Sequence, residues 1–205
     1  MGLKENFTSL CLLFCDNDTL TDHLWTEIEK KYSGKGRHYH TLIHLENMFS
    51  ELELVKDKIL NFNTISFSVF YHDIIYDATS KLNEEKSADF AECRLQQIDV
   101  NETVTAEVTK QILATKSHQK SENGDINYLL DADLSILGKN SQSYLNYTKE
   151  IRKEYSIYPD FLYKPGRKKV LQHFLELEGI FKTEYFREKY ETQARRNIEF
   201  ELKSL

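Results

Sequence analysis

The feature that most constrains this chain is a histidine next to an aspartate, His72-Asp73, inside an otherwise apolar run. The run extends from Phe67 to Asp77 and consists mainly of aromatic and branched aliphatic residues. Burial of an imidazole and a carboxylate in such surroundings costs several kcal/mol unless both are hydrogen-bonded, paired or bound to a cation. The doublet therefore predicts compensating groups on other elements of the fold.

Composition predicts that those elements are helices. The 205 residues include only 2 prolines and 7 glycines, with few alternating β-branched runs, which favours long helices over many short strands. A chain of this length can bury about 70% of its unfolded surface. We expect one all-α domain over residues 1–205, with a core at 1–138 and C-terminal helices at 139–205 packed on it. Apolar residues recur at helical spacing in the segments 19–32, 37–54, 83–97, 101–115 and 126–137 and in three stretches after residue 140.

Charge and cysteine content exclude several classes of protein. The formal net charge of −6 argues against a general nucleic-acid-binding surface. Three cysteines without a Cys-x-x-Cys pair are typical of reduced thiols in the cytoplasm. The apolar stretch 10–15 is too short for a secretion signal or a membrane span. We expect a cytoplasmic protein without a membrane partner.

Two further stretches offer the ligand types that the doublet requires. The predicted helix 37–54 carries His40 and His44 four residues apart, on one helical face. Two aspartates, Asp131 and Asp133, are embedded in apolar sequence and need compensation in the same way. Surface or capping histidines would explain the first pair equally well. The order of these residues along the chain is His, His-Asp, Asp.

In that order the constellation resembles the HD superfamily of metal-dependent phosphohydrolases, and the whole chain is similar to an uncharacterised branch of it. The resemblance implies an all-α, single-domain helical bundle of the HD-domain or phosphodiesterase-like type, in which four ligands surround a divalent ion. The matching stretches extend through most of the chain and comprise residues 37–44, 71–77, 83–88, 114–118, 130–138, 151–155 and 166–167.

The pattern of the superfamily also distinguishes between neighbouring candidates. Its histidine ligand is followed by an apolar residue three or four positions later, as His44 is by Met48, so His40 is expected beside the ion or on the substrate. Its last aspartate usually follows a small residue, which favours Asp133 and leaves Asp131 to orient a ligand or to lie near a second ion. The ligands that the resemblance implies are His44, His72, Asp73 and Asp133.

This ligand set indicates hydrolysis of a phosphate ester. Two imidazoles and two carboxylates leave positions open on an octahedral Mn, Fe, Co, Ni or Mg ion and do not select one metal. The expected reaction is attack of a metal-activated water on a nucleotide or a small phosphorylated metabolite. Nucleotidase members of the superfamily have a glutamate where this chain has Tyr76, which argues against that route of nucleoside-monophosphate cleavage. The remaining candidates for a general acid or base are Asp77, Glu84 and Asp131.

Phosphate recognition requires cations that are not ligands. The cations within the matching stretches are Arg37, Lys116, Arg152 and Arg167, and for each of them a surface salt bridge is an equally good explanation. His118 lies in a polar loop and is a further candidate for the substrate or for a second ion, since some superfamily members recruit an extra histidine from this region.

Three alternatives to a hydrolase are compatible with the sequence. A non-catalytic module would bind a nucleotide or metabolite in the same pocket without turnover. A di-iron HD-type oxygenase would need additional histidines around two irons. A purely structural helical protein would bind no metal at all.

Overall fold

The structure, a computed structural model that describes residues 2–205, is built from helices, and no strand occurs in that range. The predicted all-α single domain is thereby confirmed. None of the helices in this range is both long enough and apolar enough to cross a membrane. The ten α-helices within it are α1 (Leu3–Cys11), α2 (Asp18–Tyr32), α3 (Leu42–Glu53), α4 (Phe62–Tyr71), α5 (Asn83–Gln97), α6 (Glu102–Ala114), α7 (Gly124–Leu134), α8 (Ser141–Glu154), α9 (Asp160–Glu176) and α10 (Glu184–Ser204), and two 3-10 helices are η1 (Lys56–Lys58) and η2 (Ser135–Gly138).

Asparagines begin several of these helices. The side chains of Asn17, Asn61, Asn101 and Asn140 each accept a hydrogen bond from the backbone N–H three residues later, at 3.0 or 3.1 Å. A side-chain cap of this kind stabilises a helix by about 1 kcal/mol relative to alanine. The caps determine where α2, α4, α6 and α8 begin, and with that where their inward faces lie.

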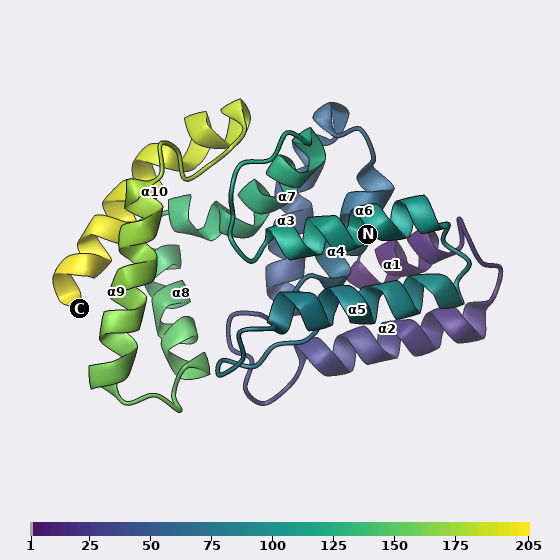
Figure 1. Ribbon diagram of the computed structural model, residues 1–205, viewed down its shortest axis with the longest axis horizontal. Coiled ribbons are helices and arrows are strands. Elements are labelled where there is room, and N and C mark those ends of the chain that lie inside the picture. Colours follow the sequence, from purple (N-terminus) through teal and green to yellow (C-terminus); the bar gives the residue numbers. More distant parts are fainter. Residues whose placement is uncertain (1) are drawn as a thin grey trace.

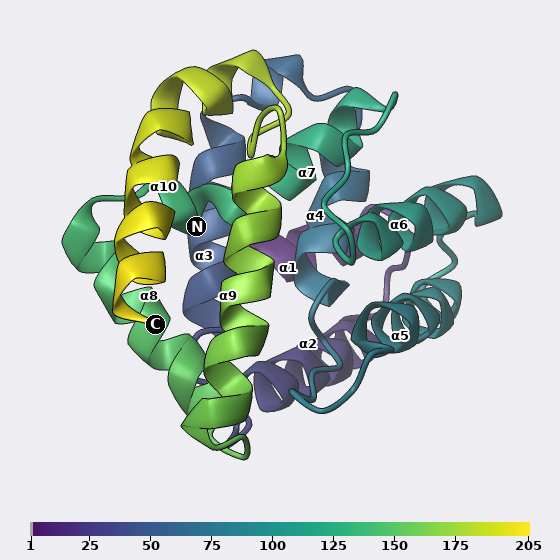
Figure 2. The ribbon, with the colours of Figure 1, turned by 60° about the vertical axis from the view of Figure 1, so that its left-hand side comes forward.

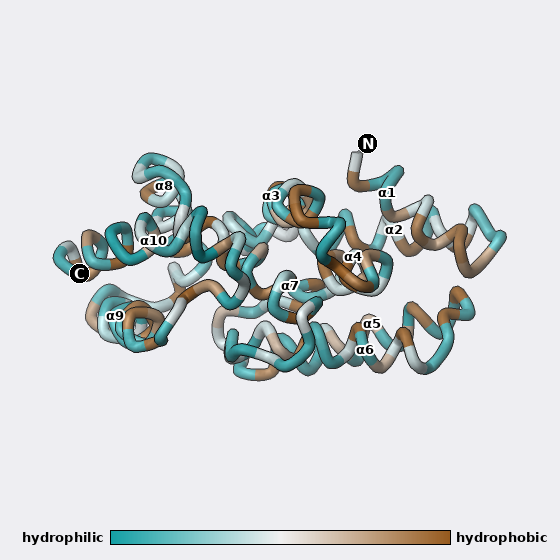
Figure 3. The backbone as a smooth tube through the Cα atoms, turned by 90° about the horizontal axis from the view of Figure 1, so that it is seen from above, coloured by the Kyte–Doolittle hydropathy of each residue, from teal (hydrophilic) through white to brown (hydrophobic). Residues whose placement is uncertain are grey.

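Helix α4 is the centre of the N-terminal part of the fold. Every residue from Thr64 to Tyr71 is buried, and the helix contacts α1, α3, α5, α6 and α7. In Figure 3 much of the tube along α4 is brown, as expected for a helix that is apolar on nearly all sides. Because its neighbours enclose α4, the residue after its last turn, His72, is only 1% exposed.

Helices α8, α9 and α10 lie together at one end of the molecule (Figures 1 and 2). Helix α10 packs on α9 and on η2, and α8 also contacts η2. Arg167 of α9 donates to the carboxylate of Glu201 in α10 at 2.8 and 3.0 Å. Glu51 of α3 accepts from Lys189 of α10 at 2.9 Å and also from Lys139. Charged pairs thus connect the C-terminal helices with one another and with α3.

One helix boundary near the doublet differs from the predicted one. The helix that carries His44 begins only at Leu42, and the residues before it form a loop. In that loop the backbone N–H groups of residues 38–40 donate to the carboxylate of Glu154 in α8. These groups are therefore satisfied without a helix. The prediction that His40 and His44 share one helical face is wrong.

The doublet itself lies at a helix end. Helix α4 ends at Tyr71, His72 is its C-terminal cap residue, and Asp73 belongs to the following turn. Within a regular helix the two side chains would point about 100° apart. The turn releases them from that constraint, so both can approach the same point.

Candidate metal centre

His72 is oriented by the last turn of α4. Its Nδ1 lies 3.0 Å from the backbone carbonyl oxygen of Val69, and because a carbonyl only accepts, Nδ1 carries a proton and donates it. Nε2 then points to the interior with its lone pair available to a cation. A hydrogen bond of this kind on the second ring nitrogen is typical of histidines that bind metals.

His44 and Asp133 meet His72 from two other helices. His44, in the first turn of α3, places Nε2 at 3.3 Å from Nε2 of His72 and at 3.1 Å from Oδ1 of Asp133. The same oxygen of Asp133, on α7, lies 3.9 Å from Nε2 of His72. The three ligand atoms are all within 4.8 Å of one another, and both histidines are buried. This group, His44, His72 and Asp133, could hold a metal ion.

The distances fit a divalent ion. An octahedral ion with bonds of about 2.1 Å separates neighbouring ligand atoms by about 3.0 Å and opposite ones by about 4.2 Å. The three observed separations, 3.1, 3.3 and 3.9 Å, lie within these limits. Two imidazole nitrogens and one carboxylate oxygen are also ligands that first-row divalent ions accept.

Asp73 lies at the border of this group. Its Oδ2 is 3.1 Å from Nε2 of His72 and 3.8 Å from Nε2 of His40. Burial alone would raise the pKa of Asp73, but the neighbouring His72 and His40 lower it by a larger amount. The pKa therefore lies below its usual range, and the carboxylate stays ionised. The guanidinium of Arg37 donates to the backbone carbonyls of Asp73 and Ile74 at 2.6 and 3.0 Å, which fixes the turn that carries Asp73.

The two imidazoles of the group differ in their affinity for protons. Burial lowers the pKa of His44. Burial also opposes a charge on His72, but the carboxylate of Asp73 more than offsets it and the pKa of His72 rises to about 9. Near neutral pH a proton and a cation therefore compete for the same nitrogen of His72.

His118 approaches Asp133 from the opposite side. Its Nε2 donates to Oδ2 of Asp133 at 2.9 Å, the oxygen that does not face His44. The backbone of His118 has a φ of 51°, a left-handed conformation that costs energy for a residue other than glycine. The surrounding loop thus holds the backbone in an unfavourable conformation, and the imidazole is thereby placed against Asp133.

Glu154 is the important residue at this site that we did not predict. Its Oε1 accepts the N–H groups of residues 38–40 at 2.8 to 3.0 Å, and its Oε2 accepts from Nδ1 of His40 at 2.7 Å and from the hydroxyl of Tyr76 at 2.9 Å. Burial opposes its ionisation, but His40 lowers the pKa of Glu154 to about 2. One signal was present in the sequence: Glu154 follows Tyr147 and Ile151 at helical spacing, on the inward face of α8.

Tyr39 is a second residue that sequence reasoning missed. Its ring centroid lies 4.9 Å from that of His44, 5.0 Å from that of His40 and 4.7 Å from that of Tyr147. Its backbone is held by Glu154. Burial raises the pKa of the Tyr39 hydroxyl well above its usual range.

The three predicted acid or base residues lie outside the group. Asp77 is exposed and accepts from the backbone and hydroxyl of Thr79, and Glu84 is in the first turn of α5. Asp131 is fully buried, and its carboxylate accepts from the backbone N–H groups of Lys182 and Thr183 at 2.7 Å. Asp131 thereby ties α7 to the start of α10. Burial raises its pKa to about 6, although those hydrogen bonds counteract the rise.

The predicted phosphate-binding cations all have partners inside the protein. Lys116 contacts the carboxylate of Glu85 and the backbone carbonyl of Lys81. Arg152 donates to Asp160 and to the carbonyls of Tyr155 and Tyr158, and Arg167 donates to Glu201. Arg37 holds the turn at Asp73, as described above.

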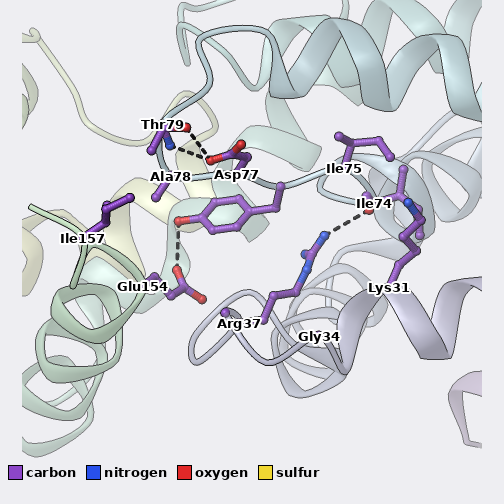
Figure 4. A pocket seen from close by; sticks show the side chains of 12 residues that line it. Lys31, Gly34, Arg37, Ile74, Ile75, Asp77, Ala78, Thr79, Glu154 and Ile157 are labelled. Atoms are coloured by element: carbon purple, nitrogen blue, oxygen red, sulfur yellow. Dashed lines mark hydrogen bonds between the residues drawn. The ribbon is translucent and has the colours of Figure 1, made fainter.

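A pocket of about 480 Å³ has Glu154 and Arg37 in its wall (Figure 4). Its walls include Tyr76, Asp77 and Ile157, and none of the three ligand residues lines it. The ring centroid of Tyr76 is 4.4 Å from that of His40. Tyr76 and Glu154 therefore form the boundary between this pocket and the histidines.

The geometry brings together His40, His44, His72, Asp73, His118 and Asp133 from elements that are far apart in the chain. Comparisons of this chain with known protein families, with curated proteins and with solved structures found no match. The group of His44, His72 and Asp133 is thus the finding on which an argument about function can rest.

Proposed function

We propose that this protein is a metal-dependent phosphohydrolase of the HD type, which hydrolyses a phosphate ester of a nucleotide or small phosphorylated metabolite. The observation that carries the proposal is the buried group of His44, His72 and Asp133, contributed by three different elements in the order that the superfamily resemblance implies. Buried groups of this kind are rarely left without a partner in proteins.

His44, His72 and Asp133 would hold the ion, with Asp73 beside them as a further ligand. A divalent ion bound there lowers the pKa of a coordinated water and neutralises charge on phosphoryl oxygens. The carbonyl of Val69 keeps Nδ1 of His72 protonated and Nε2 free to bind. Arg37 fixes the turn that presents Asp73.

The remaining polar groups would act on the substrate from the partly exposed edge. Glu154 binds Nδ1 of His40, so that Nε2 of His40 is directed toward Asp73. Tyr39, whose ring lies beside His44, and His118, which contacts Asp133, are the other polar side chains here. These groups can orient an ester and supply a proton to its leaving group.

A phosphate-ester panel with metal-stripped protein tests the proposal. Turnover should be absent in the stripped protein and should return on addition of Mn²⁺, Co²⁺, Ni²⁺ or Mg²⁺. His44→Ala should remain inactive, whereas His23→Ala, which removes an exposed histidine of α2, should behave as the wild type. Tight binding of a nucleotide with no turnover under any metal would favour a non-catalytic binding module instead.

A second candidate, a di-iron oxygenase on the same scaffold, is favoured by one observation. Two additional histidines, His40 and His118, lie against the aspartates of the site, so four imidazoles and two carboxylates are available for two ions. Iron-loaded protein would then contain about two irons per chain and would consume oxygen. Iron binding without oxygen uptake would exclude this candidate.

A further inference from the structure

The pocket of Figure 4 lies where three segments of the chain meet. Its volume of about 480 Å³ is within the range of about 300–1,000 Å³ that is usual for small-molecule sites. None of His44, His72 and Asp133 lines it. The walls come from the C-terminal end of α2 with the following loop, from the turn after α4 and from the end of α8 with the residues after it (Lys31, Gly34, Gly36 and Arg37; residues 74–79; Glu154 and Ile157). The pocket is therefore a candidate ligand site distinct from the group of three.

One end of the pocket is apolar and open to solvent. Ile157 is 68% exposed and lines the pocket together with Ala78. Both residues lie on the side away from Lys31 in Figure 4. Removal of an exposed isoleucine from water is favourable, so this end is suited to the apolar part of a ligand.

The two carboxylates in the wall already have hydrogen-bond partners. Oε1 of Glu154 accepts from the N–H groups of residues 38–40, and Oε2 accepts from His40 and Tyr76. Oδ1 of Asp77 accepts from the N–H and the hydroxyl of Thr79, both at 2.8 Å. These two bonds, drawn in Figure 4, hold Asp77 against its own turn. Neither acid is paired with a cation of the wall.

Lys31, at the opposite end, has no carboxylate partner among residues 2–205. Within that range no carboxylate oxygen lies within 4.0 Å of its Nζ. The acid one turn earlier in α2, Glu27, is bound by Arg94 through hydrogen bonds of 2.7 and 3.0 Å. Lys31 instead lies 5.6 Å from the ring centroid of Phe90. The hydrogen-bond donors of its ammonium therefore remain available to a ligand.

Arg37 adds a second cation to the same wall. Its Nη1 and Nη2 donate to the carbonyls of His40, Asp73 and Ile74. Those carbonyls fix the guanidinium but do not neutralise its charge. In the part of the chain that the structure describes, Nε of Arg37 donates to no acceptor. A planar guanidinium with a free N–H is a good donor to an anionic group.

We infer that this pocket binds a small organic anion, with its charged head at Lys31 and Arg37 and its apolar body against Ala78 and Ile157. The free donors lie at one end, the apolar surface lies at the other, and the acceptors of Glu154 are occupied. The inference does not rest on the proposed hydrolase, because the pocket shares no lining residue with His44, His72 and Asp133.

Two aromatic anions and a neutral analogue provide the test. Cinnamate, styrenesulfonate and cinnamamide have the same apolar body, and calorimetric titration of the purified full chain measures the affinity for each. We expect both anions to bind at about one per chain, and about tenfold or more tighter than the amide, the effect of one charge-assisted hydrogen bond. Addition of EDTA should leave these affinities unchanged, because the pocket contains no metal ligand of the group.

Three variants locate the bound anion. Lys31→Ala should weaken binding of cinnamate by about tenfold and leave cinnamamide unaffected. Lys30→Ala removes the neighbouring lysine in the last turn of α2, which does not line the pocket, and should have no effect. Ile157→Ser should weaken binding of the anions and of the amide alike, since it removes apolar surface that all three cover.

Four results would overturn the inference. Equal affinities for cinnamate and cinnamamide would remove the charged head from the argument. Equal losses in Lys31→Ala and Lys30→Ala would place the anion outside the pocket. Loss of binding in EDTA would assign the anion to a bound metal ion. Absence of binding by both anions at millimolar concentration would mean that the pocket is not a site for them. Hydrolysis of phosphate esters is measured separately and stands or falls independently.

Discussion

Two buried polar clusters in this molecule differ in the kinds of side chain that they bring together. Between α3 and the C-terminal helices, Glu51 is 4% exposed and its carboxylate accepts from Lys139, Lys189 and Tyr190. In the group of His44, His72 and Asp133, by contrast, Nε2 of His44 lies 3.3 Å from Nε2 of His72 and 3.1 Å from Oδ1 of Asp133. The first cluster joins a carboxylate to two lysines, whereas the second joins two imidazoles and a carboxylate that could hold a metal ion, and our proposal for the function rests on the second.

The largest expected effect is loss of metal binding at the group of His44, His72 and Asp133. His72→Ala and His44→Ala each remove one ligand and leave the others unpaired. We expect metal affinity to fall by more than about 100-fold, the upper range for residues that only support a ligand. Metal titration of the purified variants measures this, with His23→Ala as control. Full metal content in both variants would mean that this cluster is not the site.

The cluster around Glu51 should respond in stability instead of metal binding. Glu51→Ala leaves Lys139 and Lys189 without their carboxylate. We expect the free energy of unfolding to fall by about 3 kcal/mol. This is the low end of the loss for a broken buried pair, because both lysines are a third exposed. Denaturant unfolding measures the loss. Glu53→Ala, which breaks an exposed pair with Lys56, should cost less than about 1 kcal/mol. Loss of metal in Glu51→Ala would contradict the separation of the two clusters.

Glu154 supports both the fold and the site, and the effect of replacing it on the free energy of unfolding should depend on pH. Its pKa is lowered to about 2 in the folded protein, so its stabilisation is fully present above its unfolded pKa of about 4.3 and is lost as the pH falls through the folded value. We expect Glu154→Gln to lower the free energy of unfolding by roughly 2 kcal/mol at pH 7 and by less at pH 3. A deficit that stays constant between these pH values would exclude an ionised carboxylate as the cause.

The smallest expected effect distinguishes His40 from His44. His40 contacts Glu154 and borders Asp73 without belonging to the group of three. His40→Ala should therefore weaken metal binding by about tenfold, much less than His44→Ala. Metal titrations of the two variants side by side measure the difference. A larger loss of affinity in His40→Ala than in His44→Ala would mean that His40 is the ligand and His44 the neighbouring residue.

Local patterns were sufficient to predict most of the helices and part of the site, although α1 (Leu3–Cys11) was not predicted. Periodic apolar residues define helix positions without tertiary information, and in the structure the asparagine caps Asn101 and Asn140 begin two of these helices. His72 was recognisable because an imidazole in an apolar run needs a partner. Its grouping with Asp133 came from a resemblance, and the geometry of the three ligand atoms agrees with that grouping.

The contacts that could not be predicted join residues far apart in the chain. The loop before α3 replaces a predicted helix because Glu154, more than a hundred residues later, satisfies its N–H groups. Asp131 is held by the segment that begins α10, and Arg167 by Glu201. No local pattern specifies which of several carboxylates and cations will meet, since only the packed helices bring them together.

Titration of Mn²⁺ into metal-stripped wild-type protein tests the central claim most directly, with thermal stability recorded at each point. We predict saturable binding of at least about one ion per chain, accompanied by a rise in Tm because the ion binds the folded state alone. Both signals should disappear in His72→Ala and persist in Glu51→Ala. A wild-type protein that binds no ion and gains no stability would show that the group of His44, His72 and Asp133 is not a metal centre.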